Sequence, residues 1–305
     1  MNNTKTVIMA APAKVNLVLE ILGTDDSGYH KLSTVFQALD LADELLVTKA
    51  DDTELNIVDM AQSGFSVDAS PDNLVLKAQH ALETYCGRAL PCHIRLIKAI
   101  PAGGGLGGGS ADAAAMLQAL VTLYDLDIAD EDLQEIAASI GADVAFGLTG
   151  GTALGLGRGD QLTRLPTTLM PYRVVLVIPS RGLSTPEVYK HWDAMPASKR
   201  NVAWGKSQRL VNLVRQPGAL VNAILAMLSN DLQPAAFEMF PELTKIRGAM
   251  LQAGCITSML CGSGSTMFGL IEPQMTREQV TQLVNDLSHW GRVIVTGLRT
   301  RNEDR

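Results

Sequence analysis

Hydrophobic and polar residues alternate along two long segments near the start of the chain. Residues 6–22 and 32–49 are rich in Val, Leu and Thr and show partial two-residue alternation, which predicts strands. The intervening sequence GTDDSGYH, residues 23–30, is rich in Gly, Asp and Ser, and these residues favour turns. The pattern therefore predicts two long strands joined by a polar turn.

Helical spacing of apolar residues occurs in three later segments. Residues 73–87 have a loose helical pattern and end in Gly87, a common helix terminator. Residues 130–141 form an acidic helical segment that ends in Gly141. Between them lies an alanine-rich helix, with Ser110 placed to cap its N-terminus. Its apolar positions, spaced i, i+3, i+4 and i+7, are Ala113, Met116, Leu117, Leu120, Val121 and Tyr124.

Strand patterns and turn signals alternate in the rest of the chain. The predicted elements are a strand over CHIRLIKAI (92–100), a hairpin over 150–165, a buried strand over YRVVLVIPS (172–180), strands around a glycine turn in 259–271, a helix over 276–290 and a strand over 292–300. Residues 192–217 have a mixed polar pattern that predicts no element.

Composition narrows the class of protein. With 305 residues, of which 47% are hydrophobic and 19% charged, we expect a well-buried globular protein of about two domains. The formal net charge of −7 provides no excess of Lys and Arg to neutralise phosphates, so we expect no nucleic-acid partner. No apolar run approaches the roughly 18 residues of a membrane helix, and VIMAA near the N-terminus is shorter than the roughly 7-residue core of a signal peptide. We therefore expect a cytoplasmic protein with no membrane partner.

Cysteine and histidine spacing adds no metal site. The four cysteines form no CxxC pair and the five histidines form no HExxH motif, so neither a metal cluster nor a disulfide framework is expected. We expect reduced thiols.

The segment AIPAGGGLGGGSADAAAM, residues 99–116, carries six glycines within 103–109. Each glycine costs roughly 0.5–1 kcal/mol against alanine in regular structure, so a function must compensate. The match to G-x-G-x-x-G is weak because Pro101 interrupts the step from strand to loop. A Walker A loop lacks its lysine here, and a hinge seldom runs straight into a capped helix. A phosphate cradle explains more, because glycines let successive N–H groups turn inward and the following helix adds its positive end.

Three ordered motifs carry a family resemblance. PAGGGLGGGSADAA resembles the signature loop of the galactokinase, homoserine kinase, mevalonate kinase and phosphomevalonate kinase (GHMP) superfamily, and PAKVNLVLEILGTDDSGYHKLSTVFQALDL and CGSGSTMFGL agree in order. Within the superfamily, GYHKLSTVFQ, GADVAFGLTGGTALGLGRGDQL and NDLQPAAF are similar to kinases that phosphorylate a cytidine diphosphate-linked methylerythritol in non-mevalonate isoprenoid synthesis.

The resemblance implies an α+β fold of two domains. We expect an N-terminal domain over 1–165, similar to the second domain of ribosomal protein S5, and a ferredoxin-like C-terminal domain over 166–305, with the boundary near 160–172 and the active site in the cleft between them. It also implies ATP as phosphoryl donor, Mg²⁺ as cofactor, a small-molecule acceptor, and a monomer or weak homodimer.

By resemblance, Lys14 and Asp143 are catalytic. An isolated lysine in the apolar sequence VIMAAPAKVNLVL would otherwise extend to solvent, and Asp143 would otherwise be a turn or N-cap residue. Whether Asp143 removes the proton from the acceptor hydroxyl or only orients that hydroxyl stays open.

The resemblance also implies a nucleotide site and an acceptor site. The ATP-binding residues are Pro101, Ala102, Gly103, Gly104, Gly105, Leu106, Gly107, Gly108, Gly109, Ser110, Ala111 and Asn73. Ser110 is also the candidate ligand to phosphate or Mg²⁺, and Asn73 is equally explained as an N-cap. The acceptor-binding residues are Asn16, Tyr29, His30, Thr185 and Tyr189.

By resemblance, Tyr29 is expected to stack on cytosine, His30 to hydrogen-bond its edge and Tyr189 to offer a second face. Asn16 lies two residues after Lys14 and therefore on the same strand face. The sequence leaves two alternatives open. One is another kinase of the superfamily with a homoserine-like or mevalonate-like acceptor, and the other is a nucleotide-binding protein without catalysis.

Overall fold

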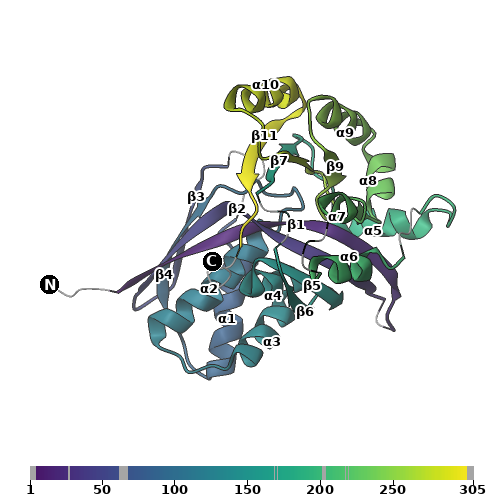
Figure 1. Cartoon of the computed structure of the whole chain (residues 1–305). Coiled ribbons are helices and arrows are strands. Elements are labelled where there is room, and N and C mark those ends of the chain that lie inside the picture. Colours follow the sequence, from purple (N-terminus) through teal and green to yellow (C-terminus); the bar gives the residue numbers. More distant parts are fainter. Residues whose placement is uncertain are drawn as a thin grey trace. The chain divides into compact units, whose positions relative to one another are not determined.

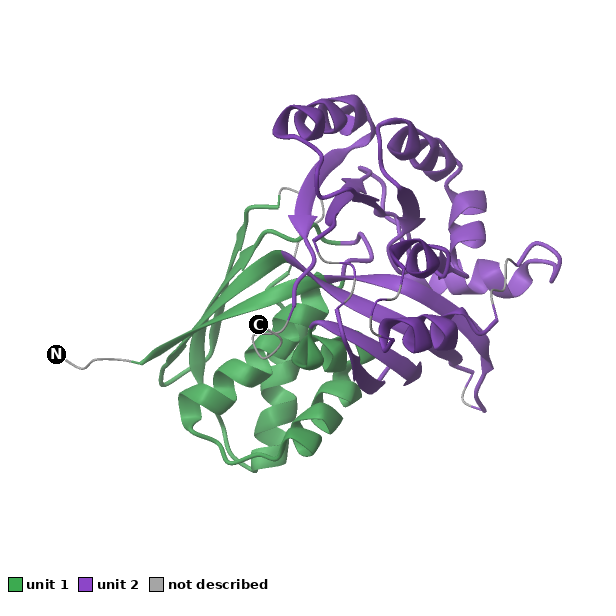
Figure 2. Cartoon of the chain, in the orientation of Figure 1, with its two compact units in different colours: residues 1–13, 41–102, 107–150 green, residues 14–40, 103–106, 151–305 purple. Residues whose placement is uncertain are grey.

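The chain divides into two compact units that do not follow a single sequence boundary. In the computed structural model the described residues are 5–26, 28–61, 68–167, 169, 171–200, 204–216, 218 and 220–300. Unit 1 comprises residues 1–13, 41–102 and 107–150, and unit 2 comprises residues 14–40, 103–106 and 151–305 (Figure 2). Two long strands, β1 (Thr6–Thr24) and β2 (His30–Lys49), contribute to both units.

Unit 1 combines a sheet with a group of helices (Figure 1). Strand β4 (Cys92–Lys98) pairs antiparallel with β2 and parallel with β3 (Glu54–Asp59). The helices are α1 (Leu74–Cys86), α2 (Gly108–Tyr124), α3 (Asp130–Ile140) and α4 (Ala142–Thr149). Helix α2 is buried over most of its length, which explains why its sequence is apolar all round rather than amphipathic.

The ends of α1 and α2 show how the sequence sets the helix boundaries. Helix α1 has Asn73 as its N-cap and Gly87 as its C-cap, and the φ of 63° at Gly87 is left-handed, as the terminal glycine predicts. Helix α2 starts earlier than predicted, with Gly107 as its N-cap, so the expectation that Ser110 caps the helix is wrong. Gly107 has φ 73°, a conformation that glycine adopts readily, so the chain enters the helix before it reaches Ser110.

Unit 2 contains two groups of strands. Strand β5 (Thr152–Gly157) pairs antiparallel with β2 and with β6 (Gln161–Leu165), and β8 (Ser229–Asn230) pairs parallel with β1. The second group is an antiparallel sheet in the order β11-β7-β10-β9. Its strands are β7 (Arg173–Ile178), β9 (Thr257–Leu260), β10 (Met267–Ile271) and β11 (Arg292–Gly297).

Helices pack against the second sheet of unit 2 to form its core. They are α5 (Thr185–Ala194), α8 (Gln233–Met239), α9 (Glu242–Gln252), α10 (Arg277–Leu287) and the short 3-10 helix η1 (Ser288–Trp290). Unit 2 also contains α6 (Lys206–Val214), which begins beside Glu20 of β1, and α7 (Val221–Leu225). The core includes Val175 and Val177 of β7 and Met267 of β10. Thr276 starts α10 with a reciprocal capping box to Gln279, the arrangement that satisfies two orphan N–H groups.

Most predicted elements are confirmed. The two N-terminal strands, the hairpin at 150–165, the buried strand at 172–180 and the glycine turn within 259–271 are all present. The unassigned stretch 192–217 holds the end of α5 and all of α6, while residues 201–203 and 217 lie outside the described residues. A single domain boundary near 160–172 stays a prediction.

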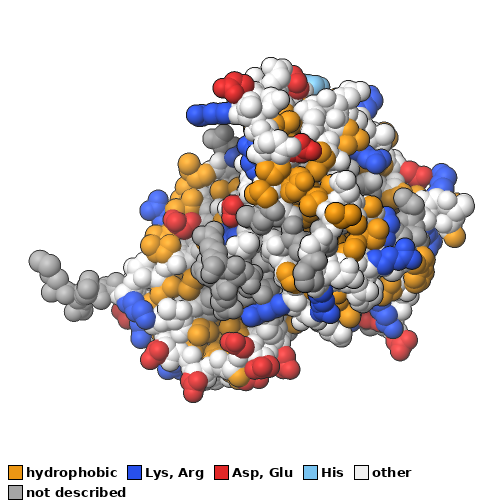
Figure 3. Space-filling model, in the orientation of Figure 1, with side chains coloured by type: hydrophobic (Ala, Val, Ile, Leu, Met, Phe, Trp, Pro, Cys, Tyr) orange, Lys and Arg blue, Asp and Glu red, His pale blue; other side chains and the backbone are white. Residues whose placement is uncertain are grey.

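The surface carries charged side chains of both signs (Figure 3), and the cysteines are not joined in disulfides. Figure 3 shows acidic and basic side chains interspersed on the face drawn, with acidic groups gathered over the helices of unit 1. All four cysteines are free thiols. Among the described residues, no helix is both long enough and apolar enough to span a membrane.

Candidate active site

Lys14 is a buried lysine on β1, in unit 2. Its residue is only 6% exposed, and its Nζ donates a hydrogen bond to Oδ1 of Asn16 at 3.0 Å. The ammonium also lies 5.6 Å from the centre of the Phe36 ring, within the range of a cation–π contact. The side chain does not extend to solvent, which rules out the surface interpretation of Lys14.

A short relay of hydrogen bonds fixes the Asn16 side chain. Its Nδ2 donates to Oγ1 of Thr34 at 2.8 Å, and that hydroxyl donates to the carbonyl oxygen of Val18 at 2.7 Å. Because the amide nitrogen is committed to Thr34, the amide oxygen faces Lys14. The predicted placement of Lys14 and Asn16 on one strand face is confirmed.

The glycine loop packs beside Lys14 through backbone atoms. The backbone N–H of Lys14 donates to the carbonyl oxygen of Leu106 at 2.9 Å, and the N–H of Thr266 donates to the carbonyl oxygen of Gly104 at 3.3 Å. Gly105 has φ +78°, and a Cβ there would lie 2.2 Å from the carbonyl oxygen of Cys261. Gly105 is therefore required by its conformation and by close packing, which argues against a flexible hinge.

The second half of the loop becomes the start of α2, in unit 1. A Cβ on Gly108 would lie 3.1 Å from Cγ2 of Ile100, so the helix begins in close contact with the segment that leaves β4. The first N–H groups of a helix have no partner within it and lie at its positive end. Ser110 belongs to this first turn, and its role as a ligand to phosphate or Mg²⁺ stays a prediction.

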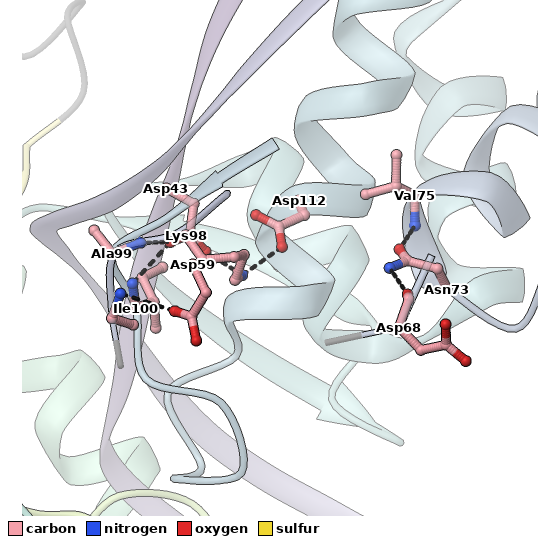
Figure 4. A network of polar contacts seen from close by, with 10 residues as sticks. Asp43, Asp59, Asp68, Asn73, Val75, Lys98, Ala99, Ile100 and Asp112 are labelled. Carbon is pink, nitrogen blue, oxygen red and sulfur yellow. Dashed lines mark hydrogen bonds and ion pairs between the residues drawn. The ribbon is translucent and has the colours of Figure 1, made fainter. Parts of the chain in front are cut away.

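A buried cluster of charged side chains supports both ends of the loop (Figure 4). Lys98, at the end of β4, binds Asp43 and lies 2.5 Å from Oδ2 of Asp112, on α2. Oδ1 of Asp43 accepts from the N–H groups of Ala99 and Ile100, at 2.5 and 2.7 Å. Lys98, Asp43 and Asp112 are each at most 3% exposed. We call these three residues the ionic cluster.

The ionic cluster has two carboxylates for one ammonium. Oδ1 of Asp112 has no hydrogen-bond partner among the described residues, and burial, followed by the field of Asp43, raises the pKa of Asp112 to about 8 against the lowering effect of Lys98. Burial lowers the pKa of Lys98, but the two carboxylates outweigh it and raise the pKa overall. The sequence did not indicate this cluster, because its three residues lie far apart along the chain.

Asn73 is the N-cap of α1. Its Oδ1 accepts from the N–H of Val75 at 2.9 Å, and its Nδ2 donates to the carbonyl oxygen of Asp68 at 2.7 Å (Figure 4). The capping interpretation is therefore confirmed. A role for Asn73 beside adenine stays a prediction.

Asp143 lies in the first turn of α4, two residues after the N-cap Gly141. A carboxylate at this position is stabilised by the positive end of the helix. Asp143 belongs to unit 1 and Lys14 to unit 2, and their joint action stays a prediction.

The turn between β1 and β2 is closed by Asp25 and presents Tyr29. The N–H of Asp25 donates to the carbonyl oxygen of Tyr29 at 2.8 Å, and the N–H of Tyr29 donates to Oδ1 of Asp25 at 3.0 Å. Tyr29 is 60% exposed, and the Arg158 guanidinium lies 4.1 Å from its ring centre. The ring is therefore accessible on this turn, and Arg158 is a neighbour that the sequence did not indicate.

His30 contacts α5 rather than solvent. Its Nε2 lies 2.9 Å from Oδ1 of Asp193, and its ring centre lies 4.6 Å from that of Tyr189. The structure thus brings His30 and Tyr189 together as predicted neighbours. Their roles toward cytosine stay predictions.

Helix α5 also reaches the glycine turn between β9 and β10. Oγ1 of Thr185, its first residue, lies 2.7 Å from Oγ of Ser263. Ser263 lies beside Gly262, where a Cβ would be 3.4 Å from Nζ of Lys14. Thr185 therefore contacts the same glycine turn that packs against Lys14.

A pocket of about 540 Å³ lies beside the Tyr29 turn within unit 2. It combines apolar side chains with charges of both signs. Its lining residues are Leu22, Asp25, Lys31, Leu32, Leu156, Gly157, Arg158, Asp160 and Gln161. Since Arg158 both lines the pocket and contacts the Tyr29 ring, the pocket and the turn share one surface.

Comparison with protein families gives two matches. Residues 73–154 match the model described as GHMP kinases N terminal domain, and residues 210–286 match the model described as GHMP kinases C terminal. The first range includes the glycine loop and Asp143, and the second includes Asn230 and the turn at 261–266.

Individual proteins are similar over most of the chain. A 4-diphosphocytidyl-2-C-methyl-D-erythritol kinase of Mycolicibacterium smegmatis is 38% identical over 86% of this chain and 81% of its own length. One of Moorella thermoacetica is 36% identical over 92% of this chain and 95% of its own length. A crystal structure of a 4-(cytidine 5'-diphospho)-2C-methyl-D-erythritol kinase superposes with a TM-score of 0.72 at 30% identity, covering 97% of this chain and all of that one.

Proposed function

The chain belongs to the GHMP kinase family, and from this premise we propose that it phosphorylates 4-(cytidine 5'-diphospho)-2-C-methyl-D-erythritol. It is an ATP-dependent small-molecule kinase that transfers the γ-phosphoryl group to the 2-hydroxyl, giving the 2-phosphate and ADP in non-mevalonate isoprenoid synthesis. The observation that carries the proposal is the 36–38% identity to kinases of that name over 86–92% of the chain.

The glycine loop and α2 supply the ATP phosphate site. Phosphoryl transfer depends mainly on positioning and on neutralising charge. The loop between Pro101 and Ala111 offers backbone N–H groups without side chains in the way, and the N-terminus of α2 adds a positive dipole. The ionic cluster holds the two ends of this loop.

Lys14 and Asp143 act on the transferring group. The acceptor oxygen attacks the γ-phosphorus, the bond to the leaving ADP oxygen breaks, and the hydroxyl proton passes to Asp143 as general base. The Lys14 ammonium stabilises negative charge on the transferring oxygens. The Asn16 oxygen supports this role by holding the ammonium in place.

The residues beside the loop suit Mg²⁺ that is bound chiefly by ATP. Among the described residues no three His, Cys, Asp or Glu side chains gather as a metal site, and Mg²⁺ in kinases commonly takes substrate phosphates, water and few protein ligands. Ser110, in the first turn of α2, would provide a hydroxyl ligand. The ion would neutralise phosphate charge there.

The Tyr29 turn, α5 and Asn16 supply the acceptor site. The exposed Tyr29 ring offers a stacking surface for cytosine. His30 hydrogen-bonds the polar edge of the base, with Tyr189 beside it. Asn16 and Thr185 bind the methylerythritol end, since Asn16 hydrogen-bonds Lys14 and Thr185 contacts Ser263 in the turn beside Lys14.

The proposal is tested by turnover with Mg²⁺–ATP and each of three acceptors: the cytidine compound, homoserine and mevalonate. ADP release and the phosphorus NMR spectrum of the product are followed. We expect a new phosphomonoester only with the cytidine compound. Turnover only with another acceptor would keep the kinase and overturn the acceptor, and no turnover would support a nucleotide-binding protein without catalysis.

A further inference from the structure

The motif NDLQPAAF, which begins at Asn230, has no role in the chemistry described so far. Asn230 lies on β8 opposite Leu19 of β1, the strand that carries Lys14. It is buried, with 7% exposure. A buried amide side chain requires hydrogen-bond partners, so its partners show what it holds.

Asn230 uses both ends of its amide. Its Nδ2 donates to the carbonyl oxygens of Gly262 at 2.7 Å and Leu260 at 3.0 Å, and its Oδ1 accepts from the N–H of Leu232 at 2.9 Å. The two carbonyls belong to the end of β9 and to the glycine turn that follows. A single side chain on β8 therefore fixes the start of this turn.

Gly262 is the point at which the turn meets the active site. A Cβ on this residue would lie 3.2 Å from the carbonyl oxygen of Gly105, 3.4 Å from Nζ of Lys14 and 3.6 Å from Oδ1 of Asn16. Its φ of +53° also favours glycine. Any movement of Gly262 toward these groups would disturb the lysine and the glycine loop together.

We propose that Asn230 is a positioning residue for phosphoryl transfer, which holds Gly262 against Lys14 and the glycine loop. The inference depends on the proposed function only through the role of Lys14, and holds for any acceptor. No other side-chain type of similar size fits these contacts. A carboxylate would face two carbonyl oxygens without a donor, and an alanine would leave both carbonyls without their buried partner.

Asp231 makes a different contact from its neighbour. Its Oδ2 accepts from the N–H of Ile21 at 2.9 Å, and its own N–H donates to the carbonyl oxygen of Leu19 at 2.9 Å. Asp231 therefore attaches β8 to β1 through contacts that do not involve the Asn230 side chain. Substitution of Asn230 is expected to loosen the turn while β8 stays in place.

The test compares Asn230→Ala and the isosteric Asn230→Asp with Ser229→Ala. Ser229 is the other residue of β8, and its hydroxyl lies 3.4 Å from the carbonyl oxygen of Met227, which is a long hydrogen bond. We measure kcat, KM for both substrates, thermal unfolding, and the number of non-hydrolysable ATP analogues bound per chain by calorimetry.

We expect kcat to fall about 100-fold in both Asn230 variants, as a displacement of about 1 Å in an active site does. The KM for the acceptor should stay within about threefold, and analogue binding should stay at one per chain, which excludes an unfolded fraction. Ser229→Ala should match the unchanged chain. An Asn230 variant with unchanged kcat, or with loss only in proportion to bound analogue, would overturn the proposal.

A second readout does not require the acceptor. Lys14 acetylation by a small reagent, followed by mass spectrometry, should be several-fold faster in both Asn230 variants than in Ser229→Ala, because the turn covers the lysine less closely. Equal rates would contradict the proposal. If the unchanged chain turns over no acceptor at all, the proposed function fails while this measurement still decides the role of Asn230.

Discussion

Two buried lysines stand beside the glycine loop, and their surroundings differ. In unit 1, Lys98 is bound by the carboxylates of Asp43 and Asp112. In unit 2, Lys14 is held by the Asn16 amide oxygen, the Phe36 ring and a backbone hydrogen bond to Leu106. Both lysines occupy apolar strands, so the sequence around each looks alike.

The difference indicates that the two lysines have different roles beside the same loop. Burying ions costs much free energy unless each finds a partner, and the ionic cluster meets this cost while it anchors Ala99, Ile100 and α2. A lysine held by an amide and a ring is suited to stabilise charge that develops on a bound phosphoryl group. Substitution of Lys98 should therefore affect folding first, and substitution of Lys14 should affect catalysis first.

The largest expected effect is on the rate of transfer. Lys14→Met should lower kcat by about 10³-fold, because it removes the positive charge beside the transferring oxygens. Affinity for an ATP analogue should stay within about threefold, since backbone groups of the loop provide most of the binding. Steady-state kinetics and calorimetry check both values. A parallel loss of rate and analogue affinity would indicate a binding role instead.

The next effect is on stability. Lys98→Met should lower the free energy of unfolding by about 3–5 kcal/mol, because the buried Asp43 carboxylate would lose its cation. The matched control is Lys77→Met, since Lys77 forms an exposed pair with Asp72 at 3.0 Å and should cost at most about 1 kcal/mol. Urea unfolding measures both. Equal small effects would mean that the ionic cluster contributes little to folding.

Gly105→Ala should have an intermediate effect and raise the KM for ATP. A Cβ on residue 105 would lie 2.2 Å from the carbonyl oxygen of Cys261, and the φ of this residue is +78°. We therefore expect the free energy of unfolding to fall by about 1–3 kcal/mol. Gly248→Ala, in helix α9 with open space around the added Cβ, should instead stabilise the chain by about 0.5–1 kcal/mol. Unfolding curves and ATP titrations of the two variants separate strain from the general effect of alanine.

The smallest effect at pH 5 is expected for Asp112→Asn. The folded chain holds a proton on Asp112 up to about pH 8, because burial raises its pKa to about 8, whereas the unfolded chain releases it near its ordinary value of about 4. The contribution of Asp112 to the stability of the unchanged chain therefore falls as pH rises from about 4 to 8. Asp112→Asn lacks this titration. Its free energy of unfolding should lie within about 1 kcal/mol of that of the unchanged chain at pH 5, and the variant should become the more stable of the two toward pH 8. A constant difference across this range would contradict the shift.

Local signals in the sequence were sufficient for most elements. Gly87 ends α1 and Gly141 ends α3 as predicted. At Gly87 the left-handed φ of 63° gives the physical reason, because glycine adopts this conformation readily. The hairpin at 150–165 was equally predictable from alternation and its glycines. The start of α2 was not, because a glycine N-cap has no side-chain signal and Ser110 offered a more familiar one.

The site was predictable only where its residues lie close in sequence. Lys14 and Asn16 share a strand face because side chains alternate along a strand. The ionic cluster joins residues 43, 98 and 112, and the hydrogen bonds of Asn230 reach Leu260 and Gly262. Such partners are set by tertiary packing, for which a single sequence holds no local signal. The contact between Arg158 and Tyr29 was missed for the same reason.

The most direct test of the two lysine roles is a single-turnover measurement of phosphoryl transfer. Rapid quench with saturating Mg²⁺–ATP and the cytidine acceptor is applied to Lys14→Met and Lys98→Met, with the rate expressed per chain that binds an ATP analogue. We expect Lys98→Met to transfer within about tenfold of the unchanged chain, and Lys14→Met to bind both substrates and transfer about 10³-fold more slowly. The reverse order of the two rates would contradict the assignment of catalysis to Lys14 and of support to the ionic cluster.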